Sequence, residues 1–237
     1  MTDPVDIAES LKRMASGSAP DIHGSSVDFA KRTALTMDGA GSRPGVELLA
    51  QIFHIVCHGN FPASIQNWYS SNRFVAFHKD YETNPDKLRP IDCGTGLRRI
   101  VCGHVNRQNT ARFASIMAPS QCAIGVPGGM DMVVHTTMLS LHEYVTRTQE
   151  QFSRHQFPTR VQLLLDLEKM FTRVSRKRIR SILAEHFPHL LHLFDLNSGH
   201  VTRSYFRTPD GAWNFIEQEE GLAQGCPLSP PLSSLVL

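Results

Sequence analysis

One carboxylate in this sequence stands where it could hold a hard metal ion. Asp166 ends the short apolar run 161–165, which is typical of a buried strand. A buried carboxylate is costly unless a cation, a hydrogen-bonding partner or water compensates its charge, and Mg²⁺ prefers such oxygen ligands. An aspartate at the end of a strand more commonly caps a helix or forms a turn, so Asp166 alone leaves both roles open.

Positive charge is concentrated in two segments, although the formal net charge of the chain is only +2. Between Lys87 and Arg112 there are six Lys or Arg residues and one acid, and between Arg173 and Arg180 there are five basic residues and no acid. Clustered positive charge attracts polyanions such as nucleic acids. A solvated helix face would produce the same pattern, so charge alone does not separate the two interpretations.

The elements that must position these residues alternate between helices and strands, which predicts an α/β (α+β) fold. Residues 1–40 show no clear period, and we expect a mobile lead-in there. Apolar spacing and breaker residues predict helices over 46–58, 62–69, 95–117, 130–145 and 175–187. Alternating or apolar runs predict strands over 73–77, 88–91, 161–166, 201–205 and 213–216. The last two strands flank Thr208-Pro209-Asp210-Gly211, which is typical of a hairpin turn.

Composition excludes several classes of protein. The chain has no run of about 18 apolar residues and no secretory pattern at its start, so we expect an intracellular protein of the nucleus or cytoplasm. Its five cysteines are scattered and never form a Cys-x-x-Cys pair. Free thiols are therefore expected rather than disulfides or a zinc site.

Four segments resemble those of reverse transcriptases. Residues 165–176 are similar to the family's first palm motif, in which a metal-binding Asp is followed five residues later by Phe or Tyr. Residues 220–230 contain Gln-Gly-x-Pro-Leu-Ser-Pro and resemble its second palm motif. Residues 87–91 are similar to the fingers strand that contacts the incoming triphosphate, and Leu97-Arg98-Arg99 points to non-LTR, LINE-like retroelements. The resemblance covers residues 45–237.

The resemblance implies a role for each matching residue. Asp166 would be the catalytic carboxylate and, with the carbonyl of Leu167, a ligand of a two-Mg²⁺ site. Phe171 would exclude ribonucleotides by abutting the 2′ position of the sugar. The remaining nucleotide-binding residues would be Lys87, Arg89, Gln224 and Gly225. Those in contact with nucleic acid would be Arg98, Arg99, Arg173, Arg176, Lys177 and Arg178.

The resemblance also implies an architecture and partners. A flexible lead-in (1–44) would precede a fingers-like region (45–158) and an incomplete, helix-rich palm (159–237) of a right-hand polymerase. The partners would be an RNA template, a DNA primer and deoxynucleoside triphosphates, with no membrane. The 237 residues contain no Tyr-x-Asp-Asp segment, so we expect a fragment that does not extend a primer alone. Two alternatives remain open, a non-catalytic nucleic-acid-binding remnant or domesticated protein and an unrelated helical interaction domain.

Overall fold

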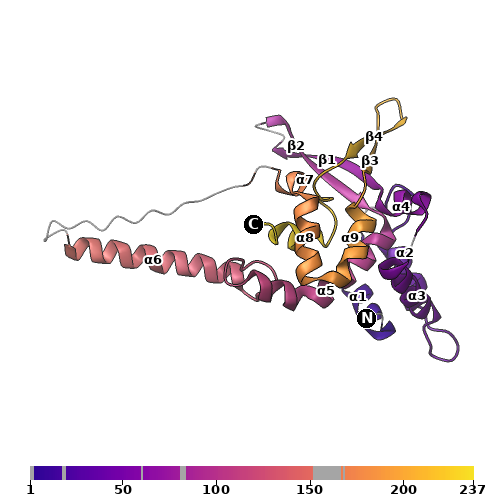
Figure 1. Cartoon of the computed structure of the whole chain (residues 1–237), viewed down its shortest axis with the longest axis horizontal. Coiled ribbons are helices and arrows are strands. Elements are labelled where there is room, and N and C mark those ends of the chain that lie inside the picture. Colours follow the sequence, from indigo (N-terminus) through magenta and orange to yellow (C-terminus); the bar gives the residue numbers. More distant parts are fainter. Residues whose placement is uncertain (1–2, 18–19, 60, 81–83, 152–166, 168) are drawn as a thin grey trace. The chain divides into compact units, whose positions relative to one another are not determined.

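The computed structural model describes residues 3–17, 20–59, 61–80, 84–151, 167 and 169–237. The chain divides into two compact units, one formed by Met1–Asn109 with Lys169–Leu237 and the other by Thr110–Glu168. The described residues form a mixed architecture of α-helices and β-strands (Figure 1).

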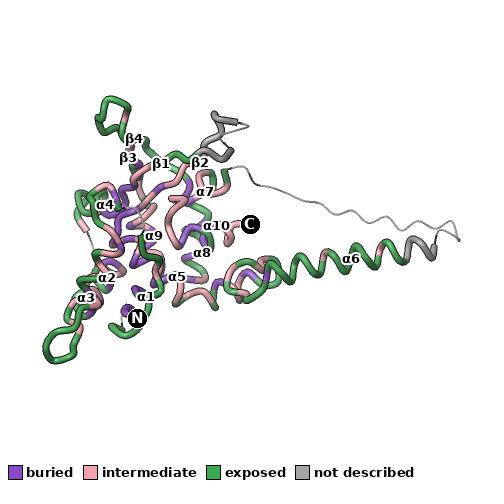
Figure 2. The backbone as a smooth tube through the Cα atoms, turned by 180° about the vertical axis from the view of Figure 1, so that it is seen from behind, coloured by how far each residue is buried: buried purple, intermediate pink, exposed green. Residues whose placement is uncertain are grey.

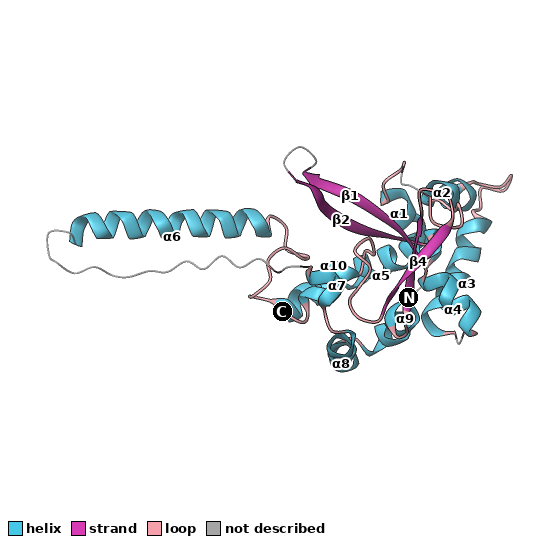
Figure 3. Cartoon of the chain, turned by 90° about the horizontal axis from the view of Figure 1, so that it is seen from above, coloured by secondary structure: helices cyan, strands magenta, loops and turns pink. Residues whose placement is uncertain are grey.

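A four-stranded mixed sheet lies in the first unit. Its strands are β1 (Asn72–Asp80), β2 (Asn84–Gly94), β3 (Thr202–Arg207) and β4 (Trp213–Gln218), in the order β2-β1-β3-β4. The pairs β1–β2 and β3–β4 are antiparallel hairpins. Parallel pairing of β1 with β3 joins the hairpins through only two residue pairs, Asn72 with Ser204 and Arg73 with Tyr205. The strands β1 and β2 run side by side in Figure 3.

Helices that pack mainly against one another form most of the core of the first unit, where the buried residues gather (Figure 2). They are α1 (Pro4–Arg13), α2 (Val27–Leu35), α3 (Pro44–His58), α4 (Ala63–Ser70), α5 (Gly96–Met117), α7 (Met170–Arg173), α8 (Arg176–His186), α9 (Leu191–Ser198) and α10 (Ser229–Ser234), with a 3₁₀ turn at Pro188–Leu190. The last residues of α5 belong to the second unit. Fully buried core side chains include Ile7, Leu11, Ile179, Leu183 and Phe187.

A buried polar network crosses the junction of the two hairpins. The Ser204 hydroxyl donates to Asp92 at 2.7 Å, and the Asn72 amide donates to Ser204 at 3.4 Å. Arg98 then donates to the Asn72 side-chain oxygen. Each of these four residues is at most 2% exposed, so a buried carboxylate and a buried guanidinium are linked through two neutral side chains.

Most of the predicted elements are confirmed. The helices expected at 46–58, 95–117 and 175–187 correspond to α3, α5 and α8, and the hairpin around residues 208–211 is β3–β4. The helix predicted after Pro62 is α4. Its inner face was expected to carry Ile65, Trp68 and Tyr69, which is wrong in part, since Tyr69 is buried whereas Ile65 and Trp68 are exposed. The strand expected at 161–166 lies outside the described residues.

The expected lead-in differs most from the structure. Residues 1–40 contain α1 and α2 rather than chain without regular structure. Asp3 caps α1 by accepting from the Val5 amide at 2.8 Å, and Ile7 and Leu11 lie one helical turn apart and are fully buried. The short length of this apolar stripe explains why the segment showed no clear period.

The second unit contains α6 (Gly129–Gln151), which confirms the helix expected at 130–145. On this helix the apolar side chains of Val133, Val134, Met138 and Leu141 are all exposed. None of the described helices combines the length and the apolar character needed to cross a membrane.

Candidate functional site

Two segments about fifty residues apart in sequence lie side by side in the first unit. The Leu222 amide donates to the Phe171 carbonyl at 2.6 Å, and the Gly221 amide donates to the Val174 carbonyl at 3.1 Å. Gly221 has a φ of +78°, and a Cβ there would lie 2.4 Å from the Thr172 carbonyl oxygen. Only glycine fits this position without strain, because both the left-handed backbone and the close contact exclude a side chain.

The same loop also contacts the edge strand β2. A Cβ on Gly225 would lie 2.3 Å from the carbonyl oxygen of Asp92. Segments 171–174 and 221–225 and strand β2, which contains Arg89, are therefore brought together in one region of the first unit.

The side chains predicted to contact a nucleotide are accessible to different extents. Phe171 and Gln224 are half-buried, and Arg89 is exposed. Lys87 lies in β2, but its side chain is outside the described part of the chain. Asp166 also lies outside the described residues, and Leu167 is exposed and belongs to the second unit. The convergence of Asp166 with Gln224 therefore stays a prediction.

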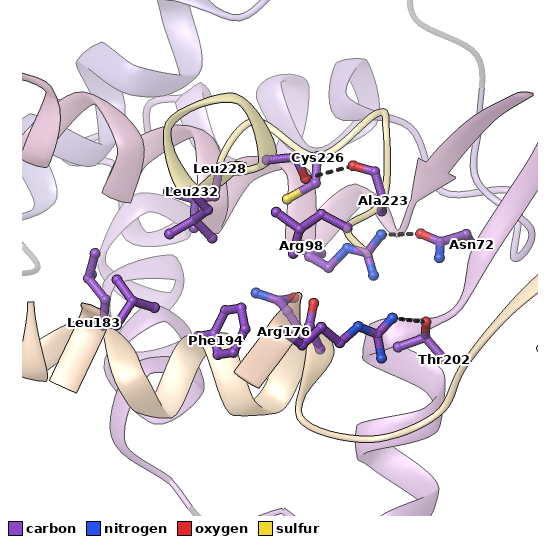
Figure 4. A pocket seen from close by; sticks show the side chains of 15 residues that line it. Asn72, Arg98, Arg176, Leu183, Phe194, Thr202, Ala223, Cys226, Leu228 and Leu232 are labelled. Carbon is purple, nitrogen blue, oxygen red and sulfur yellow. Dashed lines mark hydrogen bonds between the residues drawn. The ribbon is translucent and has the colours of Figure 1, made fainter. Parts of the chain in front are cut away.

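Two arginines predicted to contact nucleic acid are instead part of the core (Figure 4). Arg98 is 2% exposed and donates to the Ser70 carbonyl at 2.8 Å as well as to Asn72. Arg176 is 7% exposed and donates to the carbonyls of Gly221 (2.7 Å) and His200 (2.8 Å) and to the Thr202 hydroxyl (3.1 Å). Their guanidinium groups are committed to protein oxygens inside the fold, which argues against the predicted contact of these two residues with nucleic acid.

A cavity of about 30 Å³ lies between these arginines. Apolar side chains, among them Leu183, Phe194, Leu228 and Leu232, line it together with polar ones such as Asn72 and Thr202 (Figure 4). Its volume suits one or two water molecules, whereas small-molecule sites occupy hundreds of cubic ångströms. The cavity is therefore a feature of the core and not a nucleotide pocket.

The accessible part of the basic cluster lies on α7 and α8. Arg173, Lys177 and Arg178 are exposed, whereas Arg180 forms an ion pair with Asp195 at 2.9 Å. The Ser175 hydroxyl caps α8 by accepting from the Arg178 amide at 3.3 Å. Arg99, on α5, is half-buried. The surface available to a polyanion is thus smaller than the sequence count of basic residues indicates.

A thiol pair that the sequence did not single out is formed by Cys102 and Cys226, and Cys226 lines the cavity. The five cysteines are free, as predicted. A hydrogen bond with Cys226 and, after it, burial raise the pKa of Cys102, while the same bond and the Arg98 guanidinium lower the pKa of Cys226 to about 6. The two cysteines are distant in sequence, so no spacing rule could have paired them.

Within the described residues, no group of three or more His, Cys, Asp or Glu side chains is arranged to hold a metal ion. Because Asp166 is outside that part of the chain, its fit to Mg²⁺ remains a prediction. A comparison of the chain with models of known protein families gives no match, and none of the curated proteins matches it.

Proposed function

We propose that this chain is part of an RNA-directed DNA polymerase of the non-LTR retroelement type, with fingers and partial-palm architecture. The observation that supports the proposal is the packing of the 221–225 loop against both Phe171–Val174 and Asp92 of β2. These contacts join the segments whose sequences resemble the two palm motifs and the triphosphate-binding strand.

In this proposal the loop and its neighbours form the nucleotide site. The Phe171 ring would abut the sugar and disfavour a 2′-hydroxyl, while Gln224 would hydrogen-bond and Gly225 would let the backbone approach. Arg89, which is exposed, would make a two-pronged contact with the triphosphate, next to Lys87. Mg²⁺ held by Asp166 and the Leu167 carbonyl would neutralise phosphate charge.

Nucleotide binding is the appropriate test, because the 237 residues contain no Tyr-x-Asp-Asp segment. Equilibrium dialysis with dTTP and UTP in Mg²⁺ should show preference for dTTP. Phe171→Val should reduce that preference by strengthening UTP binding. Arg89→Ala should weaken the binding of both nucleotides by roughly tenfold to a hundredfold, as expected for the loss of a charge-assisted contact.

The matched control is Arg180→Ala, since Arg180 is exposed but pairs with Asp195. It should leave both affinities unchanged. The proposal fails if the wild-type chain binds neither nucleotide, or if Phe171→Val changes dTTP and UTP binding by the same factor.

A second candidate is a nucleic-acid-binding protein without a polymerase step. The exposed basic residues Arg173, Lys177 and Arg178 favour it, because their contacts with phosphates would need no nucleotide site. RNA or DNA binding by a chain that binds no nucleoside triphosphate would support this second candidate.

A further inference from the structure

The β3–β4 hairpin presents aromatic and guanidinium side chains on one of its two faces. Successive side chains alternate across a strand, and directly paired residues share a face. The pairs are Arg203 with Glu217, Tyr205 with Phe215 and Arg207 with Trp213. The parallel pairing of Arg73 with Tyr205 adds Arg73 of β1 to the same face. We call Arg73, Arg203, Tyr205, Arg207, Trp213 and Phe215 the hairpin face.

Two of the three aromatic rings on the hairpin face are open to solvent, and the third, Tyr205, is half-buried. Trp213 is 48% exposed and Phe215 is 43% exposed, so neither ring belongs to the core. The Arg207 guanidinium lies 5.3 Å from the centre of the Trp213 ring, and that of Arg203 lies 4.6 Å from the centre of the Phe215 ring. The hairpin thus carries flat apolar surfaces with a positive charge held beside each one.

A groove of about 540 Å³ adjoins this face. Arg73, Arg207 and Trp213 line one part of it, and the loop around Asp21 lines another. The Asp21 side chain is buried and accepts from the amides of His23, Ser25 and Gly96 at 2.7–2.9 Å. Among the described lining residues, the charges that no carboxylate compensates are therefore the two guanidinium groups. Arg207 is exposed, whereas Arg73 is half-buried and also donates to the Pro20 carbonyl at 3.3 Å.

We propose that the hairpin face binds single-stranded nucleic acid. Unpaired bases stack on exposed aromatic rings with little dependence on sequence, and neighbouring arginines contact the phosphates. Trp213 and Phe215 supply the stacking surfaces, and Arg73 and Arg207 supply the phosphate contacts along the groove. Glu217 opposes this binding because its carboxylate pairs with Arg203 at 2.9 Å.

The proposal is independent of the nucleotide site. Phe171, Gln224 and Gly225 take no part in the hairpin face, and neither does the basic surface on α7 and α8. The hairpin face is therefore an additional binding site, and its variants should leave the dTTP and UTP affinities unchanged.

Fluorescence anisotropy of the full 237-residue chain with labelled dT20 and U20 tests the proposal. The double variant Trp213→Ala, Phe215→Ala should weaken binding by roughly fivefold to a hundredfold for each stacked base. Trp213→Phe should keep most of the affinity. It should also remove the quenching of Trp213 fluorescence that a stacked base causes in the wild-type chain. Glu217→Gln should strengthen binding by freeing Arg203.

Phe29→Ala is the matched control, since Phe29 is 67% exposed but lies on α2 outside the hairpin face. It should bind dT20 like the wild-type chain. The proposal is overturned if the double variant keeps full affinity, if a blunt duplex of equal length competes as well as dT20, or if no oligonucleotide binds at low salt. The last result would leave a protein partner as the occupant of this face.

Discussion

Gly225 approaches the backbone of Asp92 so closely that a Cβ at residue 225 would lie 2.3 Å from the Asp92 carbonyl oxygen. The contact holds the 221–225 loop against the edge strand β2, two elements more than 125 residues apart in sequence. Because the obstacle is a backbone atom, a side chain at this position can be accommodated only by moving the loop or the strand.

Gly225→Ala should destabilise the fold by about 1–3 kcal/mol, the usual cost of overpacking a tight contact. Urea unfolding followed by circular dichroism measures the effect. Gly103→Ala is the control, because the added Cβ would lie at an ordinary van der Waals distance of 3.9 Å from Pro227. Alanine also has a higher helix propensity than glycine, which suits its place in α5. Equal stability of the two variants would show that the loop does not depend on this contact.

Arg176→Met should destabilise the fold by about 3 kcal/mol or more, since it leaves three buried acceptors without their donor. Arg178→Met changes an exposed arginine on the same helix and should stay within about 0.5 kcal/mol of the wild type. Thermal unfolding of the two variants provides the comparison. A stable Arg176→Met chain would restore Arg176 as a candidate surface residue.

Stability should depend on pH through His200. Burial lowers the pKa of the His200 imidazole, and the nearby Arg176 guanidinium also lowers it, against a raising contribution from a backbone hydrogen bond at Asp195. The unfolded chain, with an ordinary pKa of about 6.5, then binds more protons than the folded chain in mildly acidic solution. The stabilising effect is complete above about pH 6.5 and is lost as pH falls through that value toward the folded pKa.

The melting temperature should therefore fall between pH 7.5 and pH 5.5. His200→Gln should show a smaller fall, because glutamine cannot take up the proton but its longer side chain can still hydrogen-bond the Ser70 hydroxyl, which lies 2.9 Å from His200 Nε2. Identical pH profiles for the two chains would assign the effect to other groups.

Nucleic-acid binding by the α7–α8 surface should depend on salt. Joint replacement of Arg173, Lys177 and Arg178 by glutamate should weaken binding and reduce the slope of log K against log salt by roughly one unit per lost phosphate contact. Arg176 is left unchanged, since its removal would perturb the fold. Asp166→Asn should bind equally or slightly better, because it removes a negative charge.

Filter binding at several salt concentrations measures these slopes. Lys12→Glu on α1 is the control, since Lys12 is exposed but already pairs with Glu9 at 2.6 Å. Binding that is insensitive to salt, or unaffected by the triple replacement, would identify the basic run as a solvated helix face.

The sequence was sufficient where local rules decide the structure. Helical spacing located α3, α5 and α8, and the Pro-Asp-Gly turn located the β3–β4 hairpin. The sequence was insufficient for Arg98 and Arg176, because the carbonyl oxygens that accept hydrogen bonds from their guanidinium groups belong to segments remote in the chain. A count of basic residues cannot distinguish a guanidinium that faces solvent from one that satisfies buried backbone.

The hairpin face was missed for a related reason. Arg203, Tyr205 and Arg207 alternate with period two, which predicts that they share a face. The pairing of Trp213 and Phe215 with that face depends on strand register, which the turn residues alone do not specify to one residue. The alternation in β3 was the available signal.

The two-residue seam between β1 and β3 has a mechanical consequence. Few backbone hydrogen bonds cross so short a joint, so it forms a pivot that resists rotation of one hairpin against the other weakly. The pivot residues Asn72 and Ser204 also carry the hydrogen bonds that link Arg98 to Asp92. A force that rotates β3–β4 would therefore also displace these buried hydrogen bonds. Because hydrogen bonds weaken when their angles change, the rotation would be felt in the interior of the molecule.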